Sequence, residues 1–290
     1  MSISIGSPYA PGAVNDAWRE AHDACDEAEI RVDSVHASAD CERLTRVLST
    51  VWDSPSRDIM DGNMVTAMAH AGNLVTAAYQ GDDLVGGSAG FCGPPGAAFH
   101  SHIVGLLPSA AGRGLGRAIK LYQRAWCLER EIATMTWTYD PLVARNAYFN
   151  IQRLGTAAVE YLPNFYGEMA DGINAGQGSD RMLIRWDLAS RRAPLEKQHL
   201  EALVHRAHPA VVDVSGRPSS YRAPQPSSHT AVIAVPENVE LLRQQDPQAG
   251  VRWRTEIRRA FQDLMSQGWQ ITGFSRSAHY VLTMKEPHEH

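Results

Sequence analysis

Hydrophobic and polar positions change period several times along this chain, and the order of the periods predicts a mixed α/β fold. Alternation of apolar and polar residues is the pattern of a half-buried strand, whereas apolar residues three or four positions apart form one face of a helix. Both patterns occur between residues 30 and 140. The predicted strands are 30–35, 73–79, 84–92, 102–107 and 133–139, and the predicted helices are 38–52, 63–71 and 117–129.

The C-terminal third of the chain repeats such patterns after a stretch rich in Pro, Ser and Gly at 213–229, which is typical of a loop or linker. The pattern then predicts a strand, two helices and two strands. The expected organisation is a flexible leader over 1–29, a main domain over 30–190, a linker over 191–229 and a smaller β-α-α-β-β lobe over 230–285.

Two predicted helices carry charged residues that we expect on their wetted faces. In the helix 117–129, Arg117, Lys120 and Arg124 lie off the apolar stripe. In the longer C-terminal helix, 247–267, several arginines also lie off the apolar stripe. A solvated face is the simplest interpretation of these arginines, and contact with an anionic ligand is the alternative.

Composition narrows the function classes. The chain has 290 residues, of which 44% are hydrophobic and 20% charged, which is enough to bury a sizeable core. Its net charge of −5 argues against nucleic acid or an anionic membrane as the main partner. No secretory signal and no apolar run near the roughly 20 residues of a bilayer span is visible. The four cysteines include no CxxC pair, so we expect free thiols in a cytoplasmic protein. We also expect no metal site, because His205 and His208 have no third ligand placed near them.

A glycine-rich turn carries the strongest chemical signal. Gly112, Gly114 and Gly116 follow the predicted strand 102–107 and come directly before a helix. Glycine permits backbone conformations that are closed to other residues, and it lets the main chain approach a ligand closely. The free N–H groups of such a turn, the positive end of the helix dipole and two flanking arginines together predict an anion site.

The spacing of this turn distinguishes it from two other phosphate loops. A Walker A loop needs Gly-Lys-Ser/Thr, but Arg117 and Ala118 occupy the places of the lysine and the hydroxyl residue, and a dinucleotide fingerprint needs a glycine where Arg117 stands. The turn instead resembles motif A of the GCN5-related N-acetyltransferase (GNAT) superfamily, Gln/Arg-x-x-Gly-x-Gly/Ala. Its glycines fall at 114 and 116, Pro108 precedes the motif, and Ala111 replaces Gln or Arg.

The resemblance covers roughly residues 30–285 and implies a fold, a cosubstrate and a binding site. The implied fold is α/β (α+β), with a mixed, mostly antiparallel sheet flanked by helices. The implied cosubstrate is acetyl-CoA or another acyl-CoA, whose pyrophosphate the turn binds. The implied cofactor-binding residues are Leu106, Leu107, Gly112, Arg113, Gly114, Leu115, Gly116 and Arg117.

The catalytic acid of the superfamily is missing from its usual place. The common pattern Asn-x-x-Ala-x-x-x-Tyr-x-x-x-Gly aligns with Ala147 and Gly155, which puts Ile151 at the tyrosine position. Isoleucine cannot protonate a leaving thiolate. Tyr148 or Tyr166 could supply the proton from another direction, although a tyrosine in such a segment is more often part of the core.

Other polar residues beside the predicted cleft are candidates for handling the acceptor. Asp140 ends a predicted strand and could act as a base or orient an amine, while Asn146 lies on the following helix; a strand-ending turn and a solvated asparagine explain them equally well. His100 and His102 precede the turn, and one could reach the cleft as a base. We favour a strand-edge histidine pair without function.

These features predict an acyl-CoA-dependent N-acyltransferase that acts by direct transfer to a small molecule, such as an amino acid or a related amine. A homodimer is compatible with the sequence. Two alternatives stay open: a non-catalytic acyl-CoA-binding or regulatory protein, and an enzyme of the same fold with another thioester reaction, decarboxylation or hydrolysis.

Overall fold

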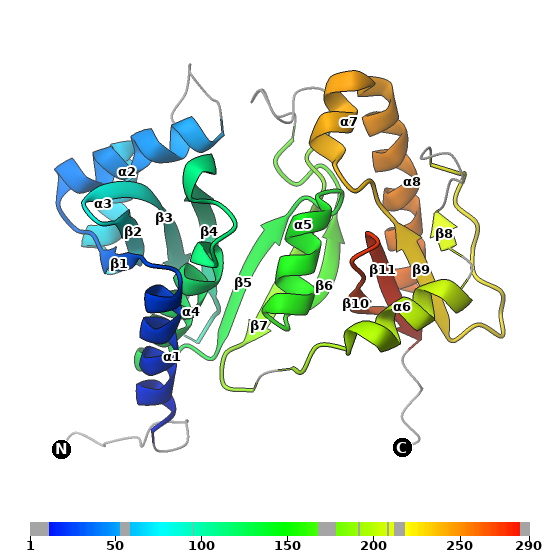
Figure 1. The fold of residues 1–290 in the computed structure, drawn as a ribbon, viewed down its shortest axis with the longest axis horizontal. Coiled ribbons are helices and arrows are strands. Elements are labelled where there is room, and N and C mark those ends of the chain that lie inside the picture. The colour runs from blue at the N-terminus through cyan, green and yellow to red at the C-terminus, as the bar shows by residue number, and fades with distance from the viewer. Residues whose placement is uncertain are drawn as a thin grey trace. The chain divides into compact units, whose positions relative to one another are not determined.

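The computed structural model describes residues 12–52, 59–94, 96–167, 178–190, 192–207, 209–211 and 218–284 (Figure 1). The chain divides into two compact units. The first comprises Met1–Trp137 with Asp187–Ser190, and the second comprises Thr138–Trp186 with Arg191–His290. This division differs from the expected main domain over 30–190, because the chain passes from one unit to the other within a strand.

The first unit contains a five-strand arrangement in the order β1-β2-β3-β4-β5. Neighbouring strands are antiparallel from β1 to β4, whereas β4 and β5 are parallel. The predicted mostly antiparallel sheet is therefore confirmed. The strands are β1 (Arg31–Ser34), β2 (Val75–Gln80), β3 (Asp83–Cys92), β4 (Phe99–Leu106) and β5 (Thr134–Tyr139), whose last two residues belong to the second unit.

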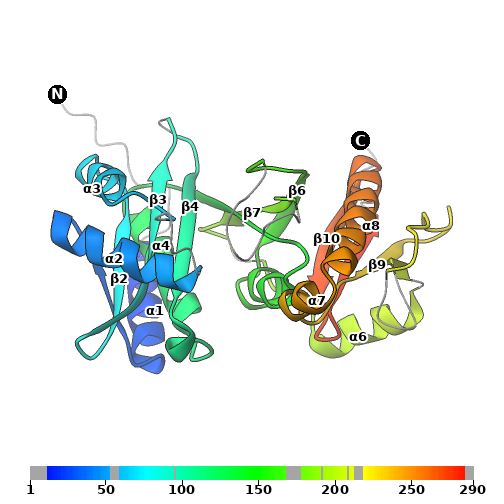
Figure 2. The same ribbon diagram turned by 90° about the horizontal axis from the view of Figure 1, so that it is seen from above.

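Helices cover both faces of this sheet (Figure 2). On one face, α2 (Ser38–Val51) and α3 (Gly62–His70) pack their apolar side chains, including Leu44, Leu48 and Val65, against Ala77 and Ile103 of the strands. On the other face, α4 (Leu115–Glu129) packs against β4. Alternation along the strands sends successive side chains to opposite faces, which is why one sheet supports both layers.

Part of the expected leader is a packed helix. Helix α1 (Ala13–Glu27) buries Ala17, Ala21, Ala24 and Cys25. It lies against α4, where the ring of Trp18 meets the ring of Tyr122 edge-on with centroids 5.0 Å apart. The small residues at intervals of three and four form a narrow stripe that lets α1 approach α4 closely.

Helix α4 is consequently covered on two sides, by the sheet and by α1. Its charged residues are therefore less solvated than the sequence predicts: Lys120 is only 4% exposed, and Arg117 and Arg124 form ion pairs with Glu20 of α1 at 3.3 and 3.5 Å. The expectation that these three residues lie on a wetted face is wrong for Lys120 because the neighbouring segments enclose it.

The second unit contains the predicted β-α-α-β-β lobe, which is confirmed. Strands β9, β10 and β11 belong to a four-stranded sheet of order β10-β11-β9-β8, and α8 buries an apolar stripe that includes Trp253, Ile257, Phe261 and Leu264. The elements are β9 (Thr230–Ala234), α7 (Val239–Gln245), α8 (Pro247–Ser266), β10 (Trp269–Phe274) and β11 (His279–Met284).

The same unit includes segments that precede the lobe in the sequence. Strands β6 (Ala157–Leu162) and β7 (Arg181–Asp187) pair antiparallel, and β7 ends at the first residue that returns to the first unit. The expected linker 191–229 contains α6 (Lys197–Arg206), which packs Leu200 on Val232 and Val281, and β8 (Pro209–Val211). The region before β6 forms α5 (Ala144–Ala147) and the π-helical η2 (Tyr148–Arg153).

Candidate functional site

The predicted glycine turn lies between β4 and α4 and has the backbone geometry that the sequence suggests. After β4 the N–H of Leu107 donates to the carbonyl of Val85 (2.8 Å), and a short 3-10 turn follows, η1 (Pro108–Ala110). Gly112 and Gly114 both have φ of 89°, in the left-handed region that favours glycine. A Cβ at either position would meet no atom within 4 Å, so backbone conformation rather than crowding requires glycine here.

The turn presents backbone donors to its outer side. Gly114 is the N-cap of α4 and has no side chain that could accept from the first turn. Its carbonyl accepts from the N–H groups of Arg117 (2.9 Å) and Ala118 (3.1 Å). Within the described residues, the N–H groups of Leu115 and Gly116 have no such backbone acceptor. With the helix dipole behind them, these donors suit an anion.

The two arginines at the turn differ. Arg117 forms ion pairs with Glu20 and Glu27 of α1 at 3.3 and 3.9 Å, so its guanidinium is already occupied on that side. Arg113 is exposed, and among the described residues its guanidinium has no ion-pair partner. Of the two arginines, Arg113 is therefore the one whose guanidinium could pair with an anion bound at the N–H donors of the turn.

The strand before the turn separates from its parallel neighbour. Strands β4 and β5 pair at Phe99↔Met135 and His100↔Thr136, and their described register ends there. Along β3 the register shifts between Ala89 and Phe91, which is a β-bulge. Among the described residues of the first unit, no strand thus pairs with residues 101–106 of β4 on the side of β5. An extended amide chain could hydrogen-bond to this edge.

Three aromatic rings lie close together near the point where β4 and β5 separate. The ring centroids of His100 and His102 lie 6.2 Å apart, and Phe91 lies 5.2 and 6.0 Å from them. His100 Nδ1 is 3.2 Å from the hydroxyl of Thr136. Burial lowers the pKa of His100 to about 4, helped by the charges of His102 and Lys120, and burial also lowers the pKa of His102. Both imidazoles are therefore neutral at pH 7, and each has an unprotonated ring nitrogen.

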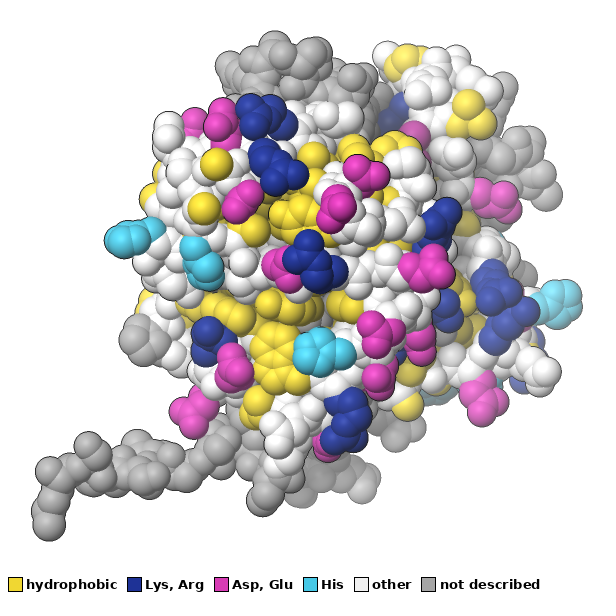
Figure 3. Space-filling model, turned by 60° about the vertical axis from the view of Figure 1, so that its left-hand side comes forward, with side chains coloured by type: hydrophobic (Ala, Val, Ile, Leu, Met, Phe, Trp, Pro, Cys, Tyr) yellow, Lys and Arg dark blue, Asp and Glu magenta, His cyan; other side chains and the backbone are white. Residues whose placement is uncertain are grey.

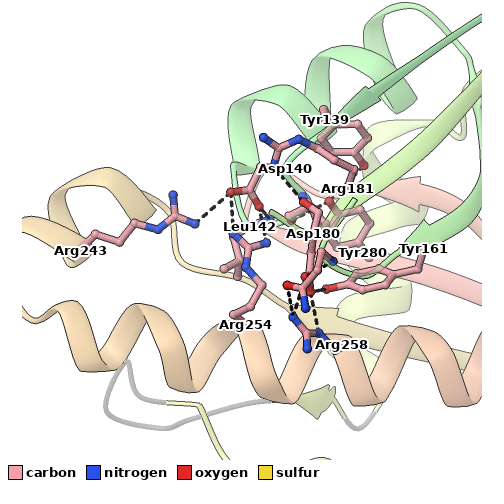
Figure 4. A network of polar contacts seen from close by, with 12 residues as sticks. Tyr139, Asp140, Leu142, Tyr161, Asp180, Arg181, Arg243, Arg254, Arg258 and Tyr280 are labelled. Carbon is pink, nitrogen blue, oxygen red and sulfur yellow. Dashed lines mark hydrogen bonds and ion pairs between the residues drawn. The ribbon is translucent and has the colours of Figure 1, made fainter. Parts of the chain in front are cut away.

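Asp140 lies in a buried ion-pair network of the second unit (Figure 4). Its carboxylate accepts two hydrogen bonds from Arg254 of α8 (2.6 and 2.7 Å) and one from Arg243 of α7 (2.9 Å). The N–H of Leu142 donates to it as well (2.9 Å). Although burial opposes ionisation, the guanidinium of Arg254 and then that of Arg243 hold the pKa of Asp140 well below its ordinary range. This environment disfavours proton acceptance by Asp140 and suits a structural anchor.

A second buried carboxylate lies in the same network. Asp180 receives two hydrogen bonds from Arg258 of α8 (2.7 and 2.9 Å) and one from the hydroxyl of Tyr161 (2.5 Å). The arginine face of α8 that we expected to be solvated is therefore buried at Arg254, which is 3% exposed, and is paired at Arg258. Arg254 and Arg258 thus join α8 to residues that precede them by 114 and 78 positions in the sequence.

The other predicted catalytic residues lie at separate places in the second unit. Asn146 is half-buried on α5. The hydroxyl of Tyr148 lies 3.4 Å from Nε of Arg276. Tyr166 is 41% exposed, with its hydroxyl 3.5 Å from that of Thr138 and the guanidinium of Arg181 5.2 Å from its ring centroid. Ile151, which stands at the family's tyrosine position, is buried in the core.

Acidic and basic side chains are interspersed on the face of the molecule that Figure 3 shows. In the described part of the chain, no group of three or more His, Cys, Asp or Glu residues is arranged to hold a metal ion. Nor does any helix among the described residues combine the length and apolar character that a membrane crossing requires.

Comparison with known proteins finds similarity in structure only. No protein-family model and no curated protein matches this sequence. A GNAT-family acetyltransferase from Desulfovibrio desulfuricans is 18% identical, with a TM-score of 0.42 over 55% of this chain and 99% of that chain. The ribosomal-protein-S18-alanine N-acetyltransferase from Escherichia coli is 12% identical, with a TM-score of 0.45 over 58% and 99%. The aminoglycoside 6'-N-acetyltransferase from Enterococcus faecium is 15% identical, with a TM-score of 0.42 over 56% and 98%. These structural neighbours are GNAT acetyltransferases, and this chain is similar to them over a little more than half of its length.

Proposed function

We propose that this protein binds an acyl-CoA at the Gly112–Gly116 turn and transfers the acyl group to an amine or similar nucleophile of a small molecule. The observation that carries the proposal is the pair of left-handed glycines before α4, beside open N–H donors. An anion of the size of a pyrophosphate suits such a helix start. The resemblance of the turn to motif A supports a coenzyme A thioester as the anion's source.

The edge of β4 supports the placement of the rest of the cosubstrate. A pantetheine arm carries two amides, and the backbone of β4 between residues 101 and 106 offers amide partners on its β5 side within the first unit. In the proposed reaction the acceptor nitrogen attacks the thioester carbonyl, a tetrahedral oxyanion forms, and the C–S bond then breaks. Backbone N–H groups at this edge would stabilise the oxyanion.

Proton transfers need a base for the acceptor nitrogen and an acid for the leaving thiolate. His100 and His102 are neutral and lie near the point where β4 and β5 separate. We propose one of them as the base instead of Asp140, because the Asp140 carboxylate is paired with two arginines. Tyr148 and Tyr166 remain the proposed candidates for the acid, and Asn146 for orienting the acceptor.

Coenzyme A binding tests the site directly. At a concentration one hundred times its dissociation constant, the ligand should stabilise the folded state by about 2.7 kcal/mol, which a thermal shift detects. Gly114→Val should abolish this shift, because a β-branched residue does not adopt the left-handed conformation without strain. Gly268→Val is the matched control, since Gly268 has the same φ of 89° and equally open surroundings. If Gly114→Val and Gly268→Val both show the same thermal shift with coenzyme A as the wild-type protein, the turn is not the binding site.

Turnover then separates the three classes of function. Acetyl-, malonyl- and succinyl-CoA are assayed across a panel of small amines, amino acids among them, with free thiol and acylated amine both measured. Amine-dependent thiol release supports acyl transfer. Thiol release without amine indicates hydrolysis, loss of carbon dioxide from malonyl-CoA indicates decarboxylation, and binding without turnover indicates a regulatory or binding protein.

A further inference from the structure

An open cavity of about 410 Å³ lies in the second unit, between α6 and the four-stranded sheet. Its lining comes from α6 and the segment before it, and from β9, β10 and β11 with the residue that precedes β9. The volume is within the range of about 300–1,000 Å³ that is usual for small-molecule sites. Among the described residues, none of those in the glycine turn or proposed for catalysis lines this cavity. The proposed acyl transfer therefore gives the cavity no role.

The cavity lies where α6 leaves part of one sheet face uncovered. Successive strand residues point to opposite faces, so Tyr280 of β11 packs on α8 and the next residue, Val281, packs on α6. Helix α8 has 20 residues and α6 has 10, which correspond to about 30 and 15 Å of helix. Thr283, on the same face as Val281, and its cross-strand partner Thr230 line the cavity. The uncovered part of the sheet thus gives the cavity a polar floor.

The wall formed by Arg192 and Leu195 is held in place by the region before β6. Nε2 of Gln152 donates a hydrogen bond to the carbonyl of Leu195 (3.1 Å). Gly155 has a φ of 68°, and a Cβ there would lie 2.4 Å from the carbonyl oxygen of Arg192. The backbone of both lining residues is thus fixed within the same unit. This wall is therefore formed before a ligand binds, which lowers the cost of binding.

Positive charge and hydrogen-bond donors line the cavity. They are the guanidinium of Arg192 and the imidazoles of His199 and His229. In the part of the chain that the structure describes, none of these three groups has an ion-pair partner. The start of α6 borders the cavity as well, because Leu195 and His199 lie on either side of its N-cap, Glu196, whose side chain makes no capping hydrogen bond. The positive end of the helix dipole therefore adds to the field of Arg192, and both favour an anion.

The remaining neighbours define the rest of the ligand's chemistry. No aspartate or glutamate among the described residues lines the cavity. Glu201 of α6 accepts instead from the backbone N–H of Arg276 (3.1 Å), which is not a lining residue. Three of the lining side chains are apolar: Leu195, Leu203 and Met284. An anion with a short apolar part matches this lining.

We propose that this cavity binds a small organic anion, whose carboxylate or phosphate group pairs with Arg192 and whose aliphatic part packs against Leu195, Leu203 and Met284. A guanidinium recognises either head group through two parallel N–H donors. Neither the site nor its ligand depends on the proposed acyl transfer. Because the lining joins the segment before α6 to strands of the C-terminal lobe, the bound anion should also stabilise the second unit.

Binding of three probes to the full-length protein tests the proposal. Isovalerate carries a carboxylate and an aliphatic part, isoamyl alcohol has the same carbon skeleton without the charge, and inorganic phosphate has the charge alone. We expect isovalerate to shift the imidazole NMR signals of His199 and His229. It should also bind at least about tenfold more tightly than the alcohol, because only the anion pairs with the guanidinium.

Three variants locate the binding. Arg192→Gln removes the charge at an exposed position and should weaken isovalerate binding about tenfold or more. Arg206→Gln is the matched control, since Arg206 is an exposed arginine of α6 that does not line the cavity, and its affinity should equal that of wild type. His199→Trp fills the cavity from an exposed position and should weaken the binding of isovalerate and of the alcohol. Thermal melts of the variants without probe verify that each is folded.

The comparison of the two anions identifies the head group. Tighter binding of phosphate than of isovalerate, with the same loss in Arg192→Gln, assigns a phosphorylated ligand, and the reverse order assigns a carboxylate. Either order supports the site. The proposal is overturned if neither anion binds at concentrations up to about 20 mM. Equal affinities of both anions for wild type and Arg192→Gln would overturn it as well.

Discussion

Asp140→Asn should destabilise the second unit strongly, because it removes the charge that two buried guanidinium groups share. The side chains of Arg243 and Arg254 are 7% and 4% exposed, and three of their hydrogen bonds, of 2.6 to 2.9 Å, end on this one carboxylate. Asparagine can still accept from the N–H of Leu142 and from one arginine, but it cannot neutralise either. Removing one partner of a buried ion pair costs about 3–5 kcal/mol, and we expect a loss in that range.

Urea unfolding followed by tryptophan fluorescence measures the loss. Trp186 and Trp253 are buried in the second unit and report on it. Asp82→Asn is the matched control, because Asp82 is exposed in the turn between β2 and β3, and its substitution should change stability by no more than about 0.5 kcal/mol. A loss below about 1 kcal/mol in Asp140→Asn would refute the reasoning that the network is a structural anchor.

The pH dependence of the same measurement provides a second check. The folded-state pKa of Asp140 lies well below its ordinary value of 3.8, so its contribution to stability is present above that value and is lost as the pH falls through the folded-state pKa. The difference between wild type and Asp140→Asn should therefore be full at pH 6 and shrink at pH values well below 3.8. A difference that stays constant into strong acid would contradict the assigned electrostatic origin.

Three further predictions concern the acid, the C-terminal lobe and the buried lysine. Either Tyr148→Phe or Tyr166→Phe should lower turnover by about 10²-fold or more if one of these hydroxyls protonates the thiolate, and full activity of both variants would exclude both. Truncation after residue 212 removes the arginines that pair with Asp140 and much of the core of the second unit, so we expect insoluble or molten protein, and a soluble fragment with a cooperative melt would contradict this. The pKa of Lys120 falls from 10.5 to about 7 on folding, so the unfolded chain binds more protons between these values and stability should rise with pH there by up to about 1.4 kcal/mol per pH unit. Lys120→Gln should lose this slope in urea titrations, and an equal slope in both proteins would show that the lysine does not cause it.

Much of the fold was accessible from local patterns. The strand, glycine turn and helix around residue 114, and the two helices and three strands of the C-terminal lobe, occur where the periodicity predicts them. Such features depend on neighbouring residues alone: alternation defines a strand face, a stripe defines a helix face, and glycine is favoured wherever φ is positive. The sequence by itself thus determined the candidate anion site, because consecutive residues build it.

The partners of the charged residues were decided by the tertiary structure. Asp140 looked like a strand end beside a cleft, but its arginines come from positions 103 and 114 residues further along the chain. Arg117 looked solvated because the periodicity of α4 cannot indicate that α1 pairs with it. Lys120 looked solvated as well, although it is buried against Ser101 and Trp137 of the sheet. A charge interacts with whatever folding brings within a few ångströms, and its pKa follows from that environment. Local sequence determines which face a side chain occupies, whereas the packing of distant segments determines whether that face meets water, an arginine or an aromatic ring.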